Sequence, residues 1–202
     1  MSQVYKYRAN YLIYRNIFGI FIRKTKYFLM KKYKTIIADP PWNIGEMRMK
    51  KSRPNAALPY PKMKTDEICN LKVSEFADDN CNLFLWTTHT FLQDALDVMR
   101  AWGFKYHCLL TWDKTNGIPC WGFKRNTEFV LYGYKGSITV NQKGNFIKTI
   151  FTEKLTVHSR KPEIFYQIIE SNTPKDRLEI FARRKREGWD CWGNEVESDI
   201  TL

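Results

Sequence analysis

Short apolar runs alternate with stretches of helical periodicity along most of this 202-residue chain. The apolar runs are rich in β-branched and aromatic residues and predict buried strands at 35–38, 83–86, 106–112, 128–134 and 177–181. The spacing of apolar residues between them predicts helices over 65–71, 91–102 and 162–170, with Gly103 closing the second and Pro162 in the first turn of the third. Strands interleaved with helices favour an α/β fold, with helices on both faces of a sheet.

The charge of the chain is strongly basic, with 33 Lys and Arg against 21 Asp and Glu and a formal net charge of +12. Such a surplus predicts attraction to a polyanion, of which nucleic acid is the commonest in cells; the alternative is a merely soluble basic surface. The five cysteines are scattered and form no C-x-x-C pair, so we expect neither a metal site nor a disulfide framework.

The first 29 residues differ from the rest, because they are aromatic and basic and contain no acidic residue. We expect a poorly packed extension at 1–29 and a single domain at 30–202. The alternatives are a basic amphipathic arm that helps to hold nucleic acid, or sequence from ahead of the natural start. The apolar stretch at 11–22 is too short and too polar to span a bilayer and lacks a signal-peptide cleavage site, so we expect a cytoplasmic protein.

The predicted strand at 35–38 runs directly into the tetrapeptide Asp39-Pro40-Pro41-Trp42. This turn falls at the carboxyl edge of the sheet, where open α/β sheets bind their ligands. The two prolines fix φ and remove two backbone donors, so the carbonyl groups of the turn are rigid. The alternative is a structural turn in which Asp39 caps the following segment.

A rigid carbonyl beside a carboxylate suits methylation of the exocyclic amine of adenine, a poor nucleophile because its lone pair is delocalised into the ring. The Asp39 carboxylate and the Pro40 carbonyl would each accept one amine hydrogen and draw the nitrogen toward a tetrahedral shape. Both interactions strengthen as positive charge develops on the nitrogen, which favours the transition state. We expect Trp42 to stack on the base, which must leave any duplex to be reached.

Several motifs in order along the chain strengthen this interpretation. They are the turn at 39–42, Leu58-Pro59-Tyr60, Leu83-Phe84-Leu85-Trp86-Thr87, Trp112-Asp113-Lys114-Thr115-Asn116, His158-Ser159-Arg160-Lys161-Pro162-Glu163 and Gly193-Asn194-Glu195. Over residues 34–196 the chain thereby resembles the MT-A70 family of adenine-N6 methyltransferases. The resemblance implies a Rossmann-like methyltransferase sheet in circularly permuted order, and S-adenosylmethionine as the cofactor. The strand at 179–182 would support the cofactor, although Ala182 stands where many relatives have glycine.

The resemblance also implies which residues bind the cofactor. Asp39 would lie near the methionine amine, and Lys161 would meet the methionine carboxylate, a role that suits an ammonium group. His158 and Ser159 would form a loop that closes over the site, and Arg183 would lie beside the cofactor. Asn194 and Glu195 would accept hydrogen bonds from the ribose hydroxyls. Tyr60 would gate the adenine pocket. Taken alone, Lys161 reads equally as a solvated residue before a helix, and Asn194 as part of a turn.

Basic clusters flank the predicted site along the sequence. We expect a loop around 48–53 to grip phosphate through Arg48, Lys50, Lys51 and Arg53; the alternative is a solvated loop. Glu128 lies in an apolar strand and needs a partner, for which Lys124 and Arg125 are candidates.

The sequence therefore predicts S-adenosylmethionine-dependent N6-methylation of adenine in nucleic acid. DNA is the preferred substrate, because the compact chain resembles bacterial and phage members of the family. The alternatives are an RNA adenosine methyltransferase and a catalytically silent, nucleic-acid-binding partner subunit. Because the sequence contains no separate target-recognition domain, selectivity would come from loops, from a second copy in a homodimer or from a partner subunit.

Overall fold

The computed structural model describes residues 31–43, 61–140, 146–154 and 160–202. The chain divides into two compact units, residues 1–31 and 32–202, and the fold below is that of the second unit. The predicted extension at 1–29 lies outside the described residues. None of the helices in those ranges is long and apolar enough to cross a membrane.

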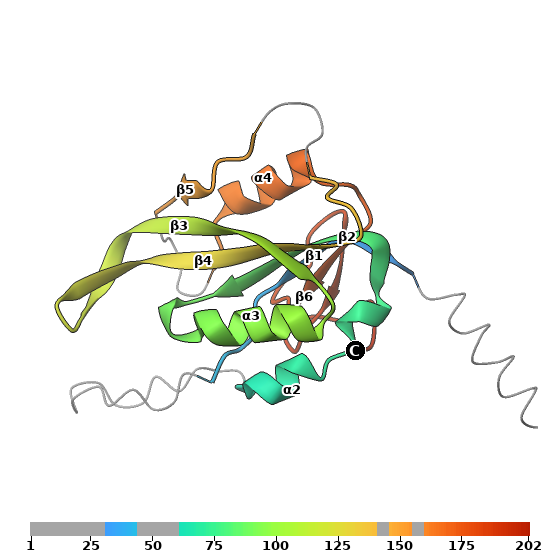
Figure 1. Ribbon diagram of the computed structural model, residues 1–202, viewed down its shortest axis with the longest axis horizontal. Helices are drawn as coiled ribbons and strands as arrows, with labels where there is room; N and C mark the ends of the chain where they lie inside the picture. The colour runs from blue at the N-terminus through green and yellow to red at the C-terminus, as the bar shows by residue number, and fades with distance from the viewer. Residues whose placement is uncertain (1–30, 44–60, 141–145, 155–159) are drawn as a thin grey trace, which may run out of the picture. The chain divides into compact units, whose positions relative to one another are not determined.

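Seven strands from the described ranges form one mixed sheet, in the order β5-β3-β4-β2-β1-β6-β7 (Figure 1). Their bounds are β1 Tyr33–Ala38, β2 Ala77–Thr87, β3 Lys105–Cys120, β4 Phe123–Lys135, β5 Ile150–Thr152, β6 Arg177–Ile180 and β7 Trp189–Trp192. The helices that accompany them are α2 Thr65–Cys69, α3 Leu92–Ala101 and α4 Glu163–Asn172, with 3-10 turns at Val73–Glu75 and His89–Phe91.

Strand β1 occupies the middle of the parallel part of the sheet, where its β-branched residues are buried on both faces. It pairs in parallel with β2 on one side and with β6 on the other. Ala38, its last residue, lies opposite Leu85 and Ile180, so the three strands reach the same edge together. Asp39 therefore emerges at the carboxyl edge of the sheet, as the sequence predicts.

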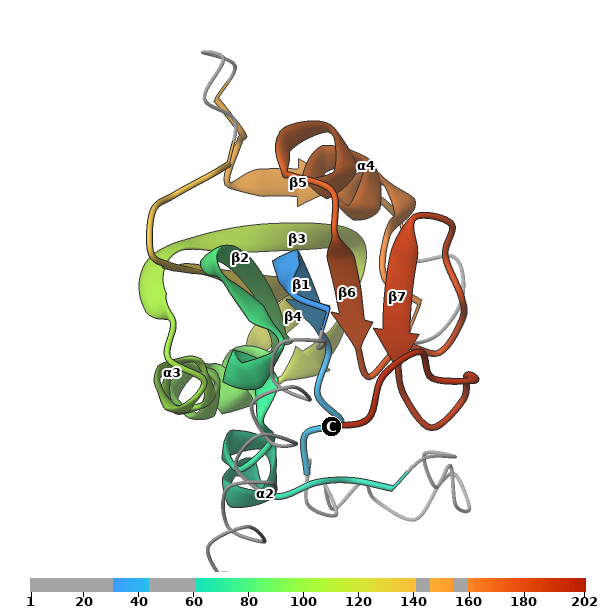
Figure 2. The same ribbon diagram turned by 90° about the vertical axis from the view of Figure 1, so that its right-hand side faces the viewer.

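Helices cover both faces of the sheet, as Figures 1 and 2 show. Alternate side chains of a strand point to opposite faces. Phe84 and Trp86 of β2 pack against Phe165 of α4 on one face. On the other face Gly133 of β4 admits α3 so closely that an added Cβ would lie 2.6 Å from the Met99 sulfur. The predicted Rossmann-like α/β fold is confirmed, while its circularly permuted order stays a prediction.

The predicted elements differ from the observed ones mainly in length. β2, β3 and β4 extend well beyond the predicted runs, because their outer parts are polar and show no apolar periodicity. The short strands β5 and β7 were not expected. Pro162 caps α4 instead of standing in its first turn.

Phe165 links α4, and with it the segment that carries Lys161, to the aromatic core. Its side chain is fully buried against Phe84, Trp86 and Phe151. We expect Phe165→Ala to lower the free energy of unfolding in urea by about 3–5 kcal/mol, through lost burial and the cavity it leaves. Gln167→Ala, an exposed change on the same helix, is the control, and equal stability of the two variants would contradict this packing.

Candidate active site at the carboxyl edge of the sheet

The turn after β1 is fixed by its own backbone and by a neighbouring segment. The Asp39 N–H donates to the Ile180 carbonyl of β6 at 3.4 Å. The Trp42 N–H donates to the Pro40 carbonyl at 2.8 Å, and the Met63 N–H to the Pro41 carbonyl at 2.9 Å. A carbonyl oxygen has two lone pairs, so the Pro40 carbonyl can still accept one further hydrogen bond.

A charged cluster surrounds the Asp39 carboxylate. Lys161 Nζ lies 3.0 Å from Asp39 Oδ2 and 3.2 Å from Glu128 Oε2, and Lys114 Nζ lies 3.1 Å from Glu128 Oε1. The four side chains are only 15–24% exposed. They come from the turn after β1, from β3, from β4 and from the segment before α4, so only the folded chain brings them together.

Mutual attraction keeps the cluster charged despite its burial. Burial alone would lower the pKa of Lys161, but the carboxylates of Asp39 and Glu128 outweigh it and raise that pKa. Burial would likewise raise the pKa of Glu128, but the ammonium groups of Lys161 and Lys114 hold it below its usual range. Lys161 also lies over the Trp86 ring, 4.6 Å from its centroid, which favours the cation.

Glu128 pairs with neither Lys124 nor Arg125, so the prediction of these partners is wrong. Lys124 lies four residues away on the same strand, roughly 13 Å at the rise of a β-strand, and both Lys124 and Arg125 are exposed. The actual partners, Lys114 and Lys161, lie on the neighbouring strand and on the segment before α4. The expectation that a Glu within an apolar strand pairs with a cation is correct, but both cations come from segments distant in the sequence.

Trp42 is buried at the back of the turn, with 6% of the residue exposed. Its ring stacks on Phe91 with centroids 5.5 Å apart, and its Nε1 donates to the Trp86 carbonyl at 3.1 Å. Stacking of Trp42 on a base stays a prediction. It requires that the face of the indole opposite Phe91 be uncovered.

The segments that follow β6 and β7 meet beside the turn. The Ala182 N–H donates to the Trp192 carbonyl at 2.9 Å, and a Cβ on Gly193 would lie 2.1 Å from the Ala182 oxygen. This close approach explains the glycine before Asn194. Arg183 and Glu195 come together across the two segments, with Nε and Oε1 3.8 Å apart.

The basic run at 183–186 is paired with acidic residues. Arg186 contacts Glu163 and Glu170, and its guanidinium lies 3.8 Å from the centroid of the Tyr166 ring. Arg184 also contacts Glu163, and Lys185 contacts Glu197 and Asp199. The run therefore serves in part to hold α4 and the C-terminal segment.

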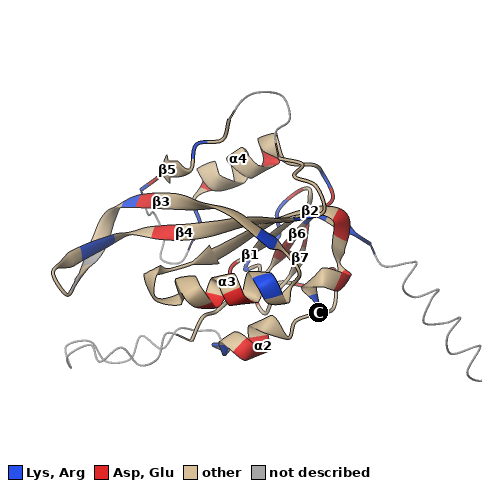
Figure 3. Ribbon diagram, viewed as in Figure 1, with Lys and Arg blue, Asp and Glu red and all other residues tan. Residues whose placement is uncertain are grey.

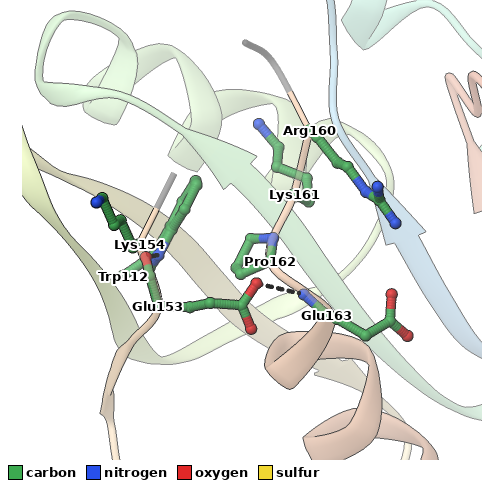
Figure 4. A pocket seen from close by; sticks show the side chains of 7 residues that line it. All are labelled: Trp112, Glu153, Lys154, Arg160, Lys161, Pro162 and Glu163. Atoms are coloured by element: carbon green, nitrogen blue, oxygen red, sulfur yellow. Dashed lines mark hydrogen bonds between the residues drawn. The ribbon is translucent and has the colours of Figure 1, made fainter. Parts of the chain in front are cut away.

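A pocket of about 190 Å³ opens beside the charged cluster (Figure 4). Within it the Glu153 carboxylate accepts hydrogen bonds from the N–H groups of Glu163 and Ile164 at 3.0 Å each, and so caps α4. Asp39 does not line this pocket, which reaches the charged cluster through Lys161. Its lining residues are Trp112, Glu153, Lys154, Arg160, Lys161, Pro162 and Glu163.

The structure brings four of the predicted site residues into contact, in two pairs: Asp39 with Lys161, and Arg183 with Glu195, which Asn194 precedes in the sequence. The other expected contacts lie outside the described residues and stay predictions; they involve Arg48, Lys50, Lys51, Arg53, Tyr60, His158 and Ser159. Among the described residues no cluster of His, Cys, Asp and Glu could hold a metal ion.

Comparison with known proteins adds independent findings. The profile of the MT-A70 family matches residues 33–195. The type II methyltransferase M.MunI of Mycoplasma sp is 33% identical over 186 residues, covering 82% of this chain and 78% of that protein. A probable MT-A70-like N(6)-adenosine-methyltransferase of Oryza sativa subsp. japonica is 30% identical, covering 87% of this chain and 24% of that protein. The human catalytic subunit METTL3 is 27% identical, and this chain spans 30% of its length.

Glu179, on β6, provides a test of the electrostatics near the turn. Burial raises its pKa, the hydrogen bond from the Tyr166 hydroxyl lowers it, and the Asp39 charge raises it, with a net upward shift. A carboxyl group whose folded pKa is raised costs stability as the pH climbs above its unfolded value of about 4.3. We expect Glu179→Gln, which keeps the acceptor for Tyr166, to raise Tm by roughly 2–4 °C at pH 8 and to change it little at pH 4.

Differential scanning calorimetry across this pH range measures the difference directly. Glu187→Gln, at an exposed position, is the control. A difference in Tm between wild type and Glu179→Gln that is the same at both pH values would contradict the raised pKa.

Proposed function

The chain belongs to the MT-A70 family, and from this membership and its charged turn we propose that it methylates N6 of adenine in DNA with S-adenosylmethionine. Its relatives are named N(6)-adenosine-methyltransferases and a type II methyltransferase, and the enzyme is accordingly an adenine-N6 methyltransferase. The observation that carries the proposal for this site is Asp39 itself. It stands on a proline-rigid turn at the sheet edge, with Lys161 Nζ 3.0 Å from its Oδ2.

Asp39 and Pro40 would act on the amine of the adenine. Lys161 contacts Asp39 Oδ2, and no residue of the described ranges donates to Oδ1, which is therefore available for one amine hydrogen. The second lone pair of the Pro40 carbonyl accepts the other. Both acceptors are fixed beforehand, so they favour the nitrogen as it becomes tetrahedral and cationic, without reorganisation during the reaction.

The cluster also fits the amino-acid end of the cofactor. An ammonium group has three N–H donors, and Asp39 and Glu128 occupy two of those of Lys161. The third is free to meet a carboxylate, while Asp39 offers its negative charge to an amine. Bound S-adenosylmethionine supplies an electrophilic methyl carbon, whose bond to sulfur breaks as the bond to N6 forms. The product nitrogen then releases its extra proton.

Arg183, Asn194 and Glu195 would hold the rest of the cofactor. The polar oxygens of Asn194 and Glu195 suit ribose hydroxyls, and both side chains are exposed at the segment after β7. His158 and Ser159 would close over the site, and Tyr60 would gate the adenine pocket. Trp42, which is 6% exposed and stacked on Phe91, would contact the base through its other ring face once that face is uncovered.

The preference for DNA is supported by the share of each relative's length that this chain matches and by the net charge of the chain. This chain matches 78% of the length of the type II methyltransferase, but less than a third of the plant and human relatives cited above. The formal charge of +12 suits a polyanionic substrate, and the basic loop at 48–53 would contact phosphates. RNA is the alternative substrate. A silent subunit is disfavoured because the charged cluster around Asp39 is intact, and a second copy or a partner would add sequence selectivity.

Replacing the charge of Asp39 tests the proposed role. We expect Asp39→Asn to lower kcat for transfer of radiolabelled methyl to unmodified DNA by roughly 10²–10³-fold, the usual loss when one group that stabilises a transition state is removed. Asp176→Asn is the matched control. Asp176 lies at the opposite edge of the sheet in the left-handed region (φ 66°), which asparagine tolerates. Turnover of Asp39→Asn near that of wild type would refute the assignment.

Replacing Lys161 tests the proposed cofactor contact. We expect Lys161→Met to weaken binding of S-adenosylmethionine by about 10–100-fold in calorimetry, as expected for loss of a hydrogen bond between charged groups. Lys154→Met, an exposed lysine of the adjacent pocket, is the control and should leave Kd unchanged. An unchanged Kd for a folded Lys161→Met protein would exclude the contact.

A further inference from the structure

The ends of β3 and β4 extend past the rest of the sheet as a two-stranded arm, residues 114–127 (Figure 1). β4 pairs with β2 only as far as Phe129, opposite Thr87. Beyond that point the arm pairs only with itself, through Ile118 with Arg125 and Cys120 with Phe123. At its base the Asp113 carboxylate accepts hydrogen bonds from the Thr115 N–H at 2.9 Å and from the Asn126 amide at 3.0 Å, which ties the two strands together.

Large aromatic side chains are exposed at the tip of the arm. Trp121 is 93% exposed and Phe123 is 75% exposed. Trp121 and Gly122 form the two-residue turn, both with positive φ, of 51° and 83°. Asparagine or glycine is the usual residue at the first of these positions, so the tryptophan does not serve the turn. Exposed aromatic groups of this size mark a binding surface.

The charge of the arm identifies the kind of partner. Residues 114–127 contain Lys114, Lys124 and Arg125 and no acidic residue. Lys124 and Arg125 are exposed beside the aromatic tip, and the basic groups of the arm are visible in Figure 3. Aromatic rings that stack on bases, together with cations that meet phosphates, are the combination with which proteins hold opened nucleic acid strands.

The arm also starts at the reaction centre. Glu128, at its root, is ion-paired with Lys161, which contacts Asp39. The arm leaves the sheet at the edge where β1 and β2 end, and the tip lies seven residues beyond Glu128, roughly 23 Å at the rise of a β-strand. That reach is comparable to about seven stacked base steps.

We propose that the arm is a wedge for nucleic acid: Trp121 inserts among bases several steps away from the target adenine and stacks on them, while Lys124 and Arg125 contact the phosphates that flank them. The proposal rests on the proposed function, because it opens the duplex that an adenine must leave to be methylated. A second copy of the chain or a protein partner is the rival occupant. The exposed cations without any acidic residue favour a polyanion.

The test compares the same unmethylated DNA as duplex and after heat denaturation. We expect Trp121→Ala to lower kcat/KM for methyl transfer by at least about tenfold on the duplex and by less than about threefold on denatured strands. Trp121→Phe, which keeps a stacking ring, should recover most of the loss. Phe146→Ala is the matched control, because Phe146 is 97% exposed and precedes the start of β5, the end of that strand farther from the tip, since β5 runs parallel to β3.

Each contrary result is distinct. Equal activity of Trp121→Ala and wild type on the duplex, or an equal loss on both substrates, overturns the wedge. If sedimentation shows that wild type is a dimer and that Trp121→Ala is a monomer, the wedge is also overturned, in favour of a contact between copies of the chain. If wild type methylates neither substrate, the proposed function fails. In that case, fluorescence anisotropy with labelled duplex DNA tests the wedge. Binding by Trp121→Ala that is at least fivefold weaker than that of wild type supports it, and unchanged binding overturns it.

Discussion

One ammonium group, that of Lys161, joins the parts of this protein on which its chemistry depends. It contacts the carboxylates of Asp39 and Glu128, which lie 89 residues apart in the sequence, from a third segment that leads into α4. Charges as little exposed as these are stable only in combination, because removing one leaves another buried and uncompensated, at a cost of about 3–5 kcal/mol. Lys114 completes the balance on Glu128, so two carboxylates meet two ammonium groups. The Asp39 carboxylate, which we propose to be reactive, is thus fixed by the same ion pairs that join the distant segments.

The sheet gives this network its rigid base. β1 lies between two parallel neighbours, with Ala38 opposite Leu85 of β2 and Ile180 of β6, and the two prolines prevent the chain from continuing as a strand or a helix. Trp42 anchors the far end of the turn against Phe91. On the cofactor side, the close approach of Gly193 to Ala182 fixes the segments that carry Asn194 and Arg183. The acceptors therefore stand in place before any substrate arrives, which is the condition for electrostatic catalysis.

The central strands, the main helices and the turn could be predicted from local sequence, because apolar runs, the spacing of apolar residues and a pair of prolines are visible there. The ion pairs of Lys161 and Glu128 could not be predicted, since they depend on how distant segments meet. The arm at 114–127 was missed for another reason: its exposed, polar strands show neither burial nor apolar alternation. The basic run at 183–186 has no acidic residue within it, so its pairing with Glu163, Glu170, Glu195, Glu197 and Asp199 depends on the fold. The sequence therefore predicted the position of the turn, but not the ion pairs that hold its carboxylate.

A crystal structure of the protein with S-adenosylmethionine or its demethylated product bound would test the central claim most directly. The account predicts that the Asp39 side chain faces the methyl position, with Lys161 Nζ within about 3.5 Å of both Asp39 and the methionine carboxylate. An Asp39 side chain directed away from that position, or a cofactor bound out of reach of Lys161, would contradict it.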